Sequence, residues 1–191
     1  MRPRCDWCRD DKLYMRYHDE EWGKPLFDNQ RLFEFLVLET AQAGLSWITI
    51  LRRRENYRVA FDAFDVDMIA SYDEKKRQSL LADSGIIRNR LKIDSAINNA
   101  GKIVDMRNSG TSLAEYFWRF VDGQPVQNHF SRLSDIPAST DVSKKMSRDM
   151  KQRGFSFTGP TICYAFMQAT GMVNDHLTSC FRYDECAQWK S

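Results

Sequence analysis

The sequence lacks any uninterrupted apolar run long enough to cross a bilayer, and its first ten residues, MRPRCDWCRD, lack the apolar core of a secretory signal. Membrane insertion and secretion are therefore not expected, and a cytoplasmic location is predicted. Five cysteines without secretory features do not indicate a disulfide framework, which leaves metal ligation or burial as their roles. Repeats, low-complexity tracts and linkers are absent, so residues 1–191 are expected to form one unit of two helical lobes not separable in sequence.

An excess of either charge is also missing. A formal net charge of +2 is too small to indicate nucleic-acid binding by itself. Basic residues do gather in three stretches, which are Arg52, Arg53 and Arg54, then Arg88, Arg90 and Lys92, then Lys144, Lys145, Arg148, Lys151 and Arg153. These stretches form one basic face, or they are ordinary solvated helix surfaces beside acidic neighbours such as Glu55 and Asp149.

Strict alternation of apolar and polar residues is absent too, so no β-sheet is required, and apolar residues recur at helical spacing almost throughout. The pattern predicts an all-α fold. One helix is expected from Asp28, as N-cap, to Gly44, and others over 46–64, 66–72, 86–108, 112–121, 142–153 (capped by Asp141) and 161–171. In the first of these, Glu39 shares its stripe with apolar residues such as Phe35 and Leu36.

Four residues near the two ends of the chain form a candidate metal site. Cys5 and His18 lie near the start, and His176 and Cys180 form an H-x-x-x-C pattern near the end. Positions i and i+4 of a helix share a face, so the last two are expected to grip one ion together. Two cysteines and two histidines complete the tetrahedral shell of a structural zinc, which ties the two ends of the chain together.

The alternative for this pattern is a histidine that merely lies near a buried cysteine. Three further cysteines fall outside the set. Cys8 competes with Cys5 as the N-terminal ligand, Cys163 is expected to pack in the core, and Cys186 has no role that the sequence assigns.

Glu39 and a group of aromatic residues form a candidate pocket; the aromatic residues are Trp7, Tyr14, Tyr17, Trp22 and Trp47. A glutamate on an apolar stripe must be paired, hydrogen-bonded or neutral, because burial of an isolated charge is costly. One interpretation is a structural hydrogen bond to a helix terminus. The other is a pocket in which aromatic walls sandwich a flat cationic ligand, such as a flipped methylated adenine, and the carboxylate binds its exocyclic amine.

The segment RGFSFTGP, near 153–160, predicts a turn between two helices. Its glycines, Gly154 and Gly159, allow backbone N–H groups to approach a phosphate at the start of the following helix. The segment is therefore a candidate grip on a DNA backbone. An ordinary interhelical turn, in which glycine only supplies backbone freedom, is the alternative.

Long segments of the chain resemble one known family. YHDEEWGKP, FEFLVLETAQAGLSWITILRRRENYRVAF, SGIIRNRLKI and KQRGFSFTGPTICYAFMQATGMVNDH occur in this order, and together they are similar to bacterial 3-methyladenine DNA glycosylase type I. The resemblance runs from about Cys5 to Cys180. It implies an all-α fold of the helix-hairpin-helix superfamily, with RGFSFTGP as the hairpin, and alkylated double-stranded DNA as the partner; it implies no protein partner.

The resemblance also implies roles for individual residues. Glu39 contacts the adenine edge, and the pocket around it is lined by Tyr14, Tyr17, Trp22 and Trp47. Structural Zn²⁺ is bound by Cys5, His18, His176 and Cys180. Many helix-hairpin-helix glycosylases carry a catalytic aspartate near the position of Asp175, but this family is not known for one, so Asp175 is expected to be structural and to orient His176.

The activity that the resemblance implies is hydrolysis of the N-glycosidic bond of 3-methyladenine, which releases the free base and leaves an abasic site without strand cleavage. The pocket is expected to refuse 7-methylguanine, because Glu39 would meet a carbonyl instead of an amine. Two other functions compete. One is a zinc-stabilised DNA-binding module without chemistry, and the other is a zinc hydrolase, which needs an open coordination position.

Overall fold

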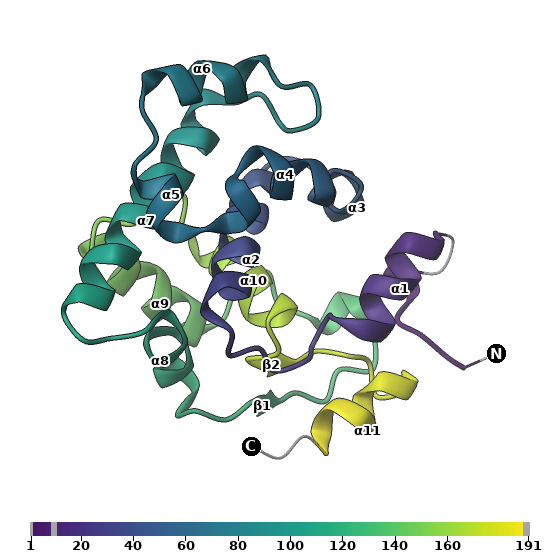
Figure 1. Cartoon of the computed structure of the whole chain (residues 1–191). Coiled ribbons are helices and arrows are strands. Elements are labelled where there is room, and N and C mark those ends of the chain that lie inside the picture. Colours follow the sequence, from purple (N-terminus) through teal and green to yellow (C-terminus); the bar gives the residue numbers. More distant parts are fainter. Residues whose placement is uncertain (1, 9–10, 189–191) are drawn as a thin grey trace.

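The computed structural model describes residues 2–8 and 11–188, and it is built almost entirely of helices (Figure 1). The α-helices are α1 (Lys12–Glu20), α2 (Asn29–Gln42), α3 (Trp47–Leu51), α4 (Arg54–Ala60), α5 (Val66–Ala70), α6 (Glu74–Ala82), α7 (Arg90–Asn108), α8 (Leu113–Trp118), α9 (Asp141–Gln152), α10 (Pro160–Ala169) and α11 (Phe181–Ala187). The prediction of a helical fold is confirmed. Within the described part of the chain, no helix is both long and apolar enough to cross a membrane.

The exception to the helical pattern is a pair of very short strands. β1 (Val126–Gln127) and β2 (Val173–Asn174) pair in parallel, with Val126 opposite Val173. Because each strand has only two residues, no alternation in the sequence could have revealed it. The pairing fixes the 122–140 connection against the segment that carries His176.

Helix α2 runs through the centre of the fold, where it packs against α3, α7, α8 and α10. Asp28 caps it as predicted, because its side chain accepts a hydrogen bond from the backbone N–H of Arg31. Every residue from Leu32 to Ala41 is buried, so the helix is covered on all sides rather than along the single predicted stripe. Two glutamates, Glu34 and Glu39, are therefore buried together with the apolar side chains.

The prediction of one continuous helix over 46–64 is wrong. The chain instead forms α3, α4 and a 3₁₀ turn at Asp62–Phe64, where three successive residues have positive φ angles of 47°, 54° and 61°. A side chain explains the division, since Arg54 opens α4 and is buried against two glutamates. The basic stretch at 52–54 is consequently not a uniformly solvated surface.

Helix starts also differ in two places. Helix α9 is capped by Thr140, one residue before the predicted Asp141, because Thr140 and Ser143 exchange side-chain hydrogen bonds in a capping box. Helix α7 begins at Arg90 after the cap Asn89, so the apolar residues from Ile86 precede it. Helices α1, α6 and α11 were not predicted, since none of them exceeds nine residues and none has a long apolar stripe.

Helices α9 and α10 are joined by a tight turn at the predicted place, 153–160. Gly154 has a φ of +83°, and its carbonyl accepts a hydrogen bond from Asn98 of α7. Asn99 fixes the next residues, because its side chain bonds both the N–H and the carbonyl of Ser156. The turn is therefore held rigidly on α7, with the N-terminus of α10 beside it.

Gly154 and Gly159 differ in backbone conformation and in the space around an added Cβ, so their alanine variants can be compared as a pair. Gly154→Ala places a side chain at a left-handed φ of +83°, with its Cβ 3.2 Å from Lys102 Cε, whereas Gly159 has a φ of −64° and an open Cβ position. We expect Gly154→Ala to lower Tm by about 2–8 °C, the equivalent of about 1–2 kcal/mol. Gly159→Ala is expected to lower Tm by less, because it loses only the N-cap preference for glycine over alanine, and equal losses in the two variants would contradict this explanation.

Candidate aromatic pocket and metal centre

Cys5, His18, His176 and Cys180 converge in the interior, although they come from opposite ends of the described chain. All four side chains are buried, and one ligand atom from each lies within 4.8 Å of the others. Nearby, the backbone N–H of Phe181 donates to the carbonyl of Pro3, so the two terminal segments also touch through their main chains. The cluster therefore sits at the junction of the terminal segments, whose helices α1 and α11 are labelled in Figure 1.

The spacing within the cluster fits a tetrahedral metal. Cys180 Sγ lies 3.4 Å from His18 Nε2 and 3.7 Å from His176 Nδ1, and Cys5 Sγ lies 3.8 Å from the same Nδ1. A zinc ion bound to sulfur at about 2.3 Å and to nitrogen at about 2.0 Å separates neighbouring ligand atoms by roughly 3.3–3.8 Å. The four ligand atoms, which all lie within 4.8 Å of one another, could therefore hold one metal ion.

Each histidine is oriented by a second partner. His176 Nε2 lies 3.0 Å from the carbonyl oxygen of Trp22, and His18 Nδ1 lies 2.8 Å from Asp19, whose carboxylate is itself paired with Arg4. Each partner can accept a hydrogen bond from the N–H of one ring nitrogen, which leaves the lone pair of the other nitrogen toward the sulfurs. Hydrogen bonds with Cys5 and the two histidines hold the pKa of the Cys180 thiol below its ordinary value, which favours the thiolate that metals bind.

The geometric reason given for the H-x-x-x-C pair is wrong, although the two side chains do meet. His176 lies in a bend after β2, and Cys180 is the N-cap of α11, so no helix carries both. The loop between them folds back on itself, with the N–H of Cys180 bonded to the carbonyl of Leu177. Spacing alone could not distinguish this loop from a helical turn.

The remaining cysteines lie outside the cluster. Cys8 is buried and its thiol faces the carbonyl of Cys5 at 3.2 Å, so it is not the N-terminal member of the set. Cys163 packs in the core as predicted, 4.0 Å from Met150 Sδ. Cys186 is also buried, with its sulfur 3.4 Å from the guanidinium of Arg182.

Glu39 and the aromatic residues around it line one pocket of about 200 Å³; those predicted are Trp7, Tyr14, Tyr17, Trp22, Glu39 and Trp47. The rings meet at steep angles. Trp7 lies 4.7 Å from Tyr14 and 5.1 Å from Trp22, and Tyr17 lies 5.4 Å from Trp47, as distances between ring centroids. Flat aromatic surfaces therefore surround a cavity with one carboxyl group in its wall.

The pocket and the metal cluster share a wall. The ring of Trp22 packs edge-on against His176, with centroids 4.6 Å apart, and Trp7 packs on His18 at 5.3 Å. Each of these tryptophan rings therefore packs against one histidine of the Cys5, His18, His176 and Cys180 cluster. The position of these two pocket walls depends on the cluster that joins the terminal segments.

Glu39 is buried without a hydrogen-bond partner among the described residues. Its residue exposure is 4%, and burial alone raises the pKa of its carboxyl group to about 8. Glu34, one of its neighbours on α2, is equally buried but receives hydrogen bonds from Arg54 and Arg58. The structural interpretation of Glu39, a hydrogen bond to a helix terminus, is therefore wrong, and its carboxyl group has no partner among the described residues.

Trp47 and the two tyrosines add polar groups to the pocket. Trp47 Nε1 is buried and has no hydrogen-bond partner in the described part of the chain, so the pocket wall contains an unpaired donor as well as the Glu39 carboxyl group. Burial raises the pKa of Tyr14 to about 12 and that of Tyr17 well above its ordinary value. Both phenols therefore remain protonated at neutral pH, and they add no negative charge to the pocket.

Four pocket residues were missed in the sequence: Gln42, Ile136, Ala165 and Gln168. Gln42 follows Glu39 by three positions and shares its helix face, which is a signal that could have found it. Ala165 and Gln168 are likewise three apart on α10. Ile136 comes from the loop before α9, and nothing in the sequence indicates that this loop reaches the pocket.

Helix α10 connects the turn that contains Gly154 and Gly159 with the pocket. Gly159 is its N-cap and supplies no side-chain cap, so the helix start keeps N–H groups for an external acceptor. Ala165 and Gln168, in the second and third turns of the same helix, line the pocket. An anion at the helix start and a ligand in the pocket would therefore be held by one rigid element.

Asp175 is structural, but it does not orient His176. Its carboxylate accepts hydrogen bonds from Tyr164 at 2.6 Å, Gln168 at 2.7 Å and Asn128 at 2.7 Å, while the His176 ring bonds to the carbonyl of Trp22 instead. Asp175 thus joins α10 to the 122–140 connection. Through Gln168 it also fixes one residue of the pocket wall.

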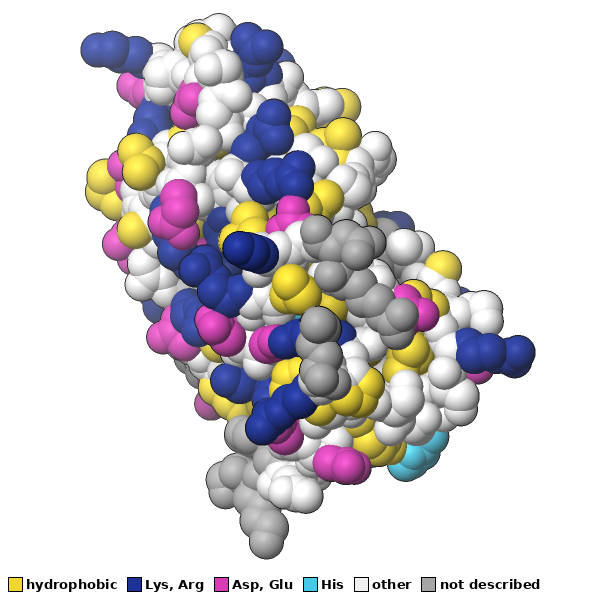
Figure 2. Space-filling model, turned by 90° about the vertical axis from the view of Figure 1, so that its right-hand side faces the viewer, with side chains coloured by type: hydrophobic (Ala, Val, Ile, Leu, Met, Phe, Trp, Pro, Cys, Tyr) yellow, Lys and Arg dark blue, Asp and Glu magenta, His cyan; other side chains and the backbone are white. Residues whose placement is uncertain are grey.

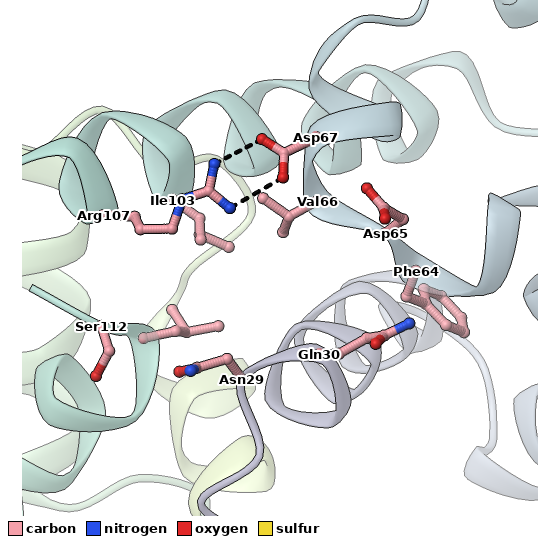
Figure 3. Close-up of a pocket in the computed structure, with 10 residues that line it drawn as sticks. Asn29, Gln30, Phe64, Asp65, Val66, Asp67, Ile103, Arg107 and Ser112 are labelled. Carbon is pink, nitrogen blue, oxygen red and sulfur yellow. Dashed lines mark hydrogen bonds and ion pairs between the residues drawn. The ribbon is translucent and has the colours of Figure 1, made fainter.

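A second hollow, of about 260 Å³, lies between the start of α2 and helices α5, α7 and α8 (Figure 3). Its polar groups bind one another or the main chain. Arg107 forms two hydrogen bonds to Asp67, Gln30 donates to the carbonyl of Ala63, and Asn29 accepts from the N–H of Ala114. Arg107 and Asp67 therefore satisfy each other's charge, in contrast to Glu39 in the aromatic pocket.

Comparison with known proteins identifies a family over nearly the whole chain. A family model described as methyladenine glycosylase matches residues 7–183. The curated DNA-3-methyladenine glycosylase 1 of Escherichia coli (strain K12) is 48% identical over 180 residues, which cover 94% of this chain and 96% of that protein.

Solved structures agree over nearly the whole chain. A crystal structure of 3-methyladenine DNA glycosylase I superposes with a TM-score of 0.92 at 51% identity, covering 94% of this chain and 98% of the other. A variant of 3-methyladenine DNA glycosylase I crystallised in complex with 3-methyladenine gives a TM-score of 0.90 at 32% identity, covering 93% and 96%. The family model's residues 7–183 include the residues that line the pocket and three of the four cluster residues, His18, His176 and Cys180.

Proposed function

This chain belongs to the methyladenine glycosylase family, and from that membership we propose that it hydrolyses the N-glycosidic bond of 3-methyladenine in alkylated double-stranded DNA. The products are free 3-methyladenine and an abasic site, and the strand is not cleaved. A cytoplasmic location is part of the same proposal. The observation that carries it is Glu39, a buried carboxyl without a partner in an aromatic pocket of about 200 Å³.

The chemistry of the substrate explains why so few catalytic groups are needed. Methylation at N3 gives the base a positive charge, so the base departs as a neutral molecule when the bond to the sugar breaks. The bonding electrons go to the base, water attacks the sugar carbon, and its proton passes to solvent. The enzyme must flip the nucleotide out of the duplex and hold the cationic base against the aromatic rings.

We assign recognition of the base to Glu39, Tyr14, Tyr17, Trp22 and Trp47. The Glu39 carboxylate accepts a hydrogen bond from the exocyclic amine, and the nearby positive charge favours its ionised form. A guanine presents a carbonyl at that edge, which would leave the carboxylate without a donor. The pocket is therefore expected to refuse 7-methylguanine.

We further propose that α9, its turn and α10 form a helix-hairpin-helix grip on the DNA backbone. The turn near Gly154 and Gly159 is rigid, and the start of α10 has no side-chain cap. Backbone N–H groups and the helix dipole at such a position bind a phosphate favourably. The pocket would then be aligned with the strand through α10.

Structural Zn²⁺ is the proposed occupant of Cys5, His18, His176 and Cys180. Two thiolates and two imidazoles at the observed spacing suit zinc, and four protein ligands leave no coordination position for water. Bound there, the ion would supply a crosslink between the terminal segments and no activated water. A zinc hydrolase is therefore not the function that this site supports.

The decisive test is release of free bases from methylated DNA, separated by chromatography. We expect prompt release of 3-methyladenine, negligible 7-methylguanine and no strand breaks before the abasic sites are cleaved chemically. DNA without methylation is the control. Binding of the duplex without release of any base would instead favour a non-catalytic DNA-binding module.

A further inference from the structure

Gln168, near the end of α10, lines the aromatic pocket with a side chain whose orientation is fixed by a buried group. Its amide nitrogen, Nε2, lies 2.7 Å from Oδ2 of Asp175. Asp175 is 1% exposed and does not itself line the pocket. The amide of Gln168 is therefore held at its nitrogen by a residue that a ligand in the pocket would not displace.

The hydrogen bond to Asp175 decides which end of the amide remains available. A carboxylate accepts hydrogen bonds and donates none, so Gln168 must turn its N–H₂ group, and not its oxygen, toward Asp175. Tyr164 and Asn128 donate to the same carboxylate at 2.6 and 2.7 Å. Oε1 of Gln168 accepts no hydrogen bond from any residue that the structure describes. The oxygen is thus the end of the amide that a ligand in the pocket can use.

The main chain at Gln168 is fixed as well. Its carbonyl accepts a hydrogen bond of 3.1 Å from the backbone N–H of Gly23, which directly follows Trp22 of the pocket lining. Glu39 reaches the pocket from α2, and α2 packs against α10. The free oxygen of Gln168 and the carboxyl group of Glu39 therefore belong to two packed helices that line the same cavity of about 200 Å³.

Gln42 is the other side-chain amide in the pocket lining, and it differs from Gln168 in this respect. Its side chain forms no hydrogen bond with a described residue. An amide that is free to turn offers either its oxygen or its N–H₂ group, so it accommodates an amine and a carbonyl equally. A fixed amide offers only one of the two, and a ligand with the wrong group leaves it unpaired. Of the two amides, Gln168 is therefore the one that can discriminate.

The surface of α1 and α3, two helices that contribute to the pocket, does not supply this discrimination. Figure 2 shows the face on which they lie, and basic side chains gather over its middle among acidic ones. Basic side chains at a surface attract a phosphate backbone whatever base is attached to it. The choice between an amine and a carbonyl is consequently left to groups inside the pocket.

We propose that Gln168 is a specificity-determining residue, which recognises the exocyclic amine of the flipped base through its side-chain oxygen. The amine of an adenine has two N–H groups, and Glu39 accepts only one of them, so the other requires a second acceptor in the pocket. Guanine has an oxygen at this position, which would face Oε1 of Gln168 without a proton between them. The inference rests on the proposed function, because it adds a contact to the same bound base.

Binding of two free bases to the purified protein tests the proposal without DNA and without catalysis. The bases are 3-methyladenine and 3-methylhypoxanthine, which carry an amine and a carbonyl at the same ring position, and binding is followed by quenching of tryptophan fluorescence. Gln168→Met keeps the length of the side chain but lacks the acceptor. We expect this variant to bind 3-methyladenine about 3- to 10-fold more weakly, which is the contribution of one hydrogen bond, and 3-methylhypoxanthine as the wild type does.

Gln42→Met is the matched control, since it makes the same chemical change in the same pocket. It should keep the wild-type ratio of the two affinities, whereas Gln168→Met should lower the preference for 3-methyladenine. An equal loss for both bases in Gln168→Met would indicate a packing role alone and would overturn the proposal. A wild type without a preference for 3-methyladenine would overturn it as well.

NMR spectroscopy of the wild type makes the test independent of how well Gln168→Met folds. The side-chain carbonyl resonance of Gln168 should shift more with 3-methyladenine than with 3-methylhypoxanthine when each base saturates the pocket. Equal shifts would contradict the contact. A protein that shows the expected binding but releases no base from methylated DNA would fail the proposed function and leave the assignment of Gln168 intact.

Discussion

Replacement of Glu39 by glutamine is expected to lower kcat/KM for release of 3-methyladenine by about 10- to 100-fold. A hydrogen bond to a charged group contributes about 1.5–3 kcal/mol, and each 1.4 kcal/mol corresponds to about a factor of ten. Glutamine keeps the shape of the side chain but lacks the negative charge that attracts the cationic base. The measurement is steady-state release from methylated DNA. Unchanged kinetics would remove Glu39 from the mechanism.

The pH dependence of the wild type should report the same group. Because burial raises the pKa of Glu39 to about 8 in the free enzyme, most molecules at pH 7 hold a neutral carboxyl that cannot attract the base as a charge. We expect kcat/KM to rise with pH until about pH 8 and then to level off. The Glu39→Gln variant should lack this rise over the same range.

The stability of the wild type is expected to fall over the pH range in which its kcat/KM rises. The folded-state pKa of Glu39, about 8, lies above its ordinary value of 4.5, so the folded protein holds a proton that the unfolded chain releases between these values. The free energy of unfolding therefore decreases as pH rises from about 4.5 to 8. Glu39→Gln removes this penalty, and its Tm should exceed that of the wild type at pH 8.

Glu34→Gln is the matched control for this effect. Both glutamates are 4% exposed on α2, but Glu34 is paired with Arg54 and Arg58. Loss of its charge leaves buried Arg54 with one partner fewer, so Tm should fall. If both variants changed Tm in the same direction, the contrast between the two environments would be wrong.

Loss of the proposed zinc is expected to lower the Tm of the protein strongly. We expect the purified protein to contain one zinc per chain by elemental analysis, and Cys180→Ser to lose most of it. The crosslink spans most of the chain, and closure of a loop longer than about 100 residues contributes about 5 kcal/mol. At about 2–4 °C per kcal/mol, Tm should fall by about 10–20 °C.

A buried cysteine outside the cluster provides the control for this variant. Cys163→Ala removes a core thiol, so it should lower Tm through packing but keep a full equivalent of zinc. The fluorescence of Trp22 and Trp7 should change only in Cys180→Ser, because both rings pack on histidines of the cluster. Full zinc content in Cys180→Ser would refute the assigned ligand set.

How much the sequence could reveal depends on the range of the interaction. Asp28 capped α2 as predicted, because capping is decided within one helical turn. Glu39 could be singled out because a carboxyl on an apolar stripe is anomalous on local grounds. Its lack of a partner could not be predicted, since Arg54 reaches Glu34 on the same helix and not Glu39.

Features that depend on contacts between residues far apart in the sequence could not be predicted from its apolar and polar pattern. The break between α3 and α4 accompanies burial of Arg54 between two acidic residues that are 20 and 33 positions away. Ile136 reaches the pocket from a loop that the β1–β2 pairing fixes, and strands of two residues carry no periodic signal. His176 and Cys180 meet through a folded loop that has the same spacing as a helical turn.

The cluster that joins the terminal segments also has a consequence for synthesis on the ribosome. Chains fold from the N-terminus as they are made, yet Cys5 and His18 wait for His176 and Cys180, which are made last among the four. Trp22 and Trp7 pack on the two histidines, so the pocket wall is completed at the same late step. A nascent chain that stops before His176 would hold all of α2 but no finished pocket, which ties the capacity to recognise damage to completed translation.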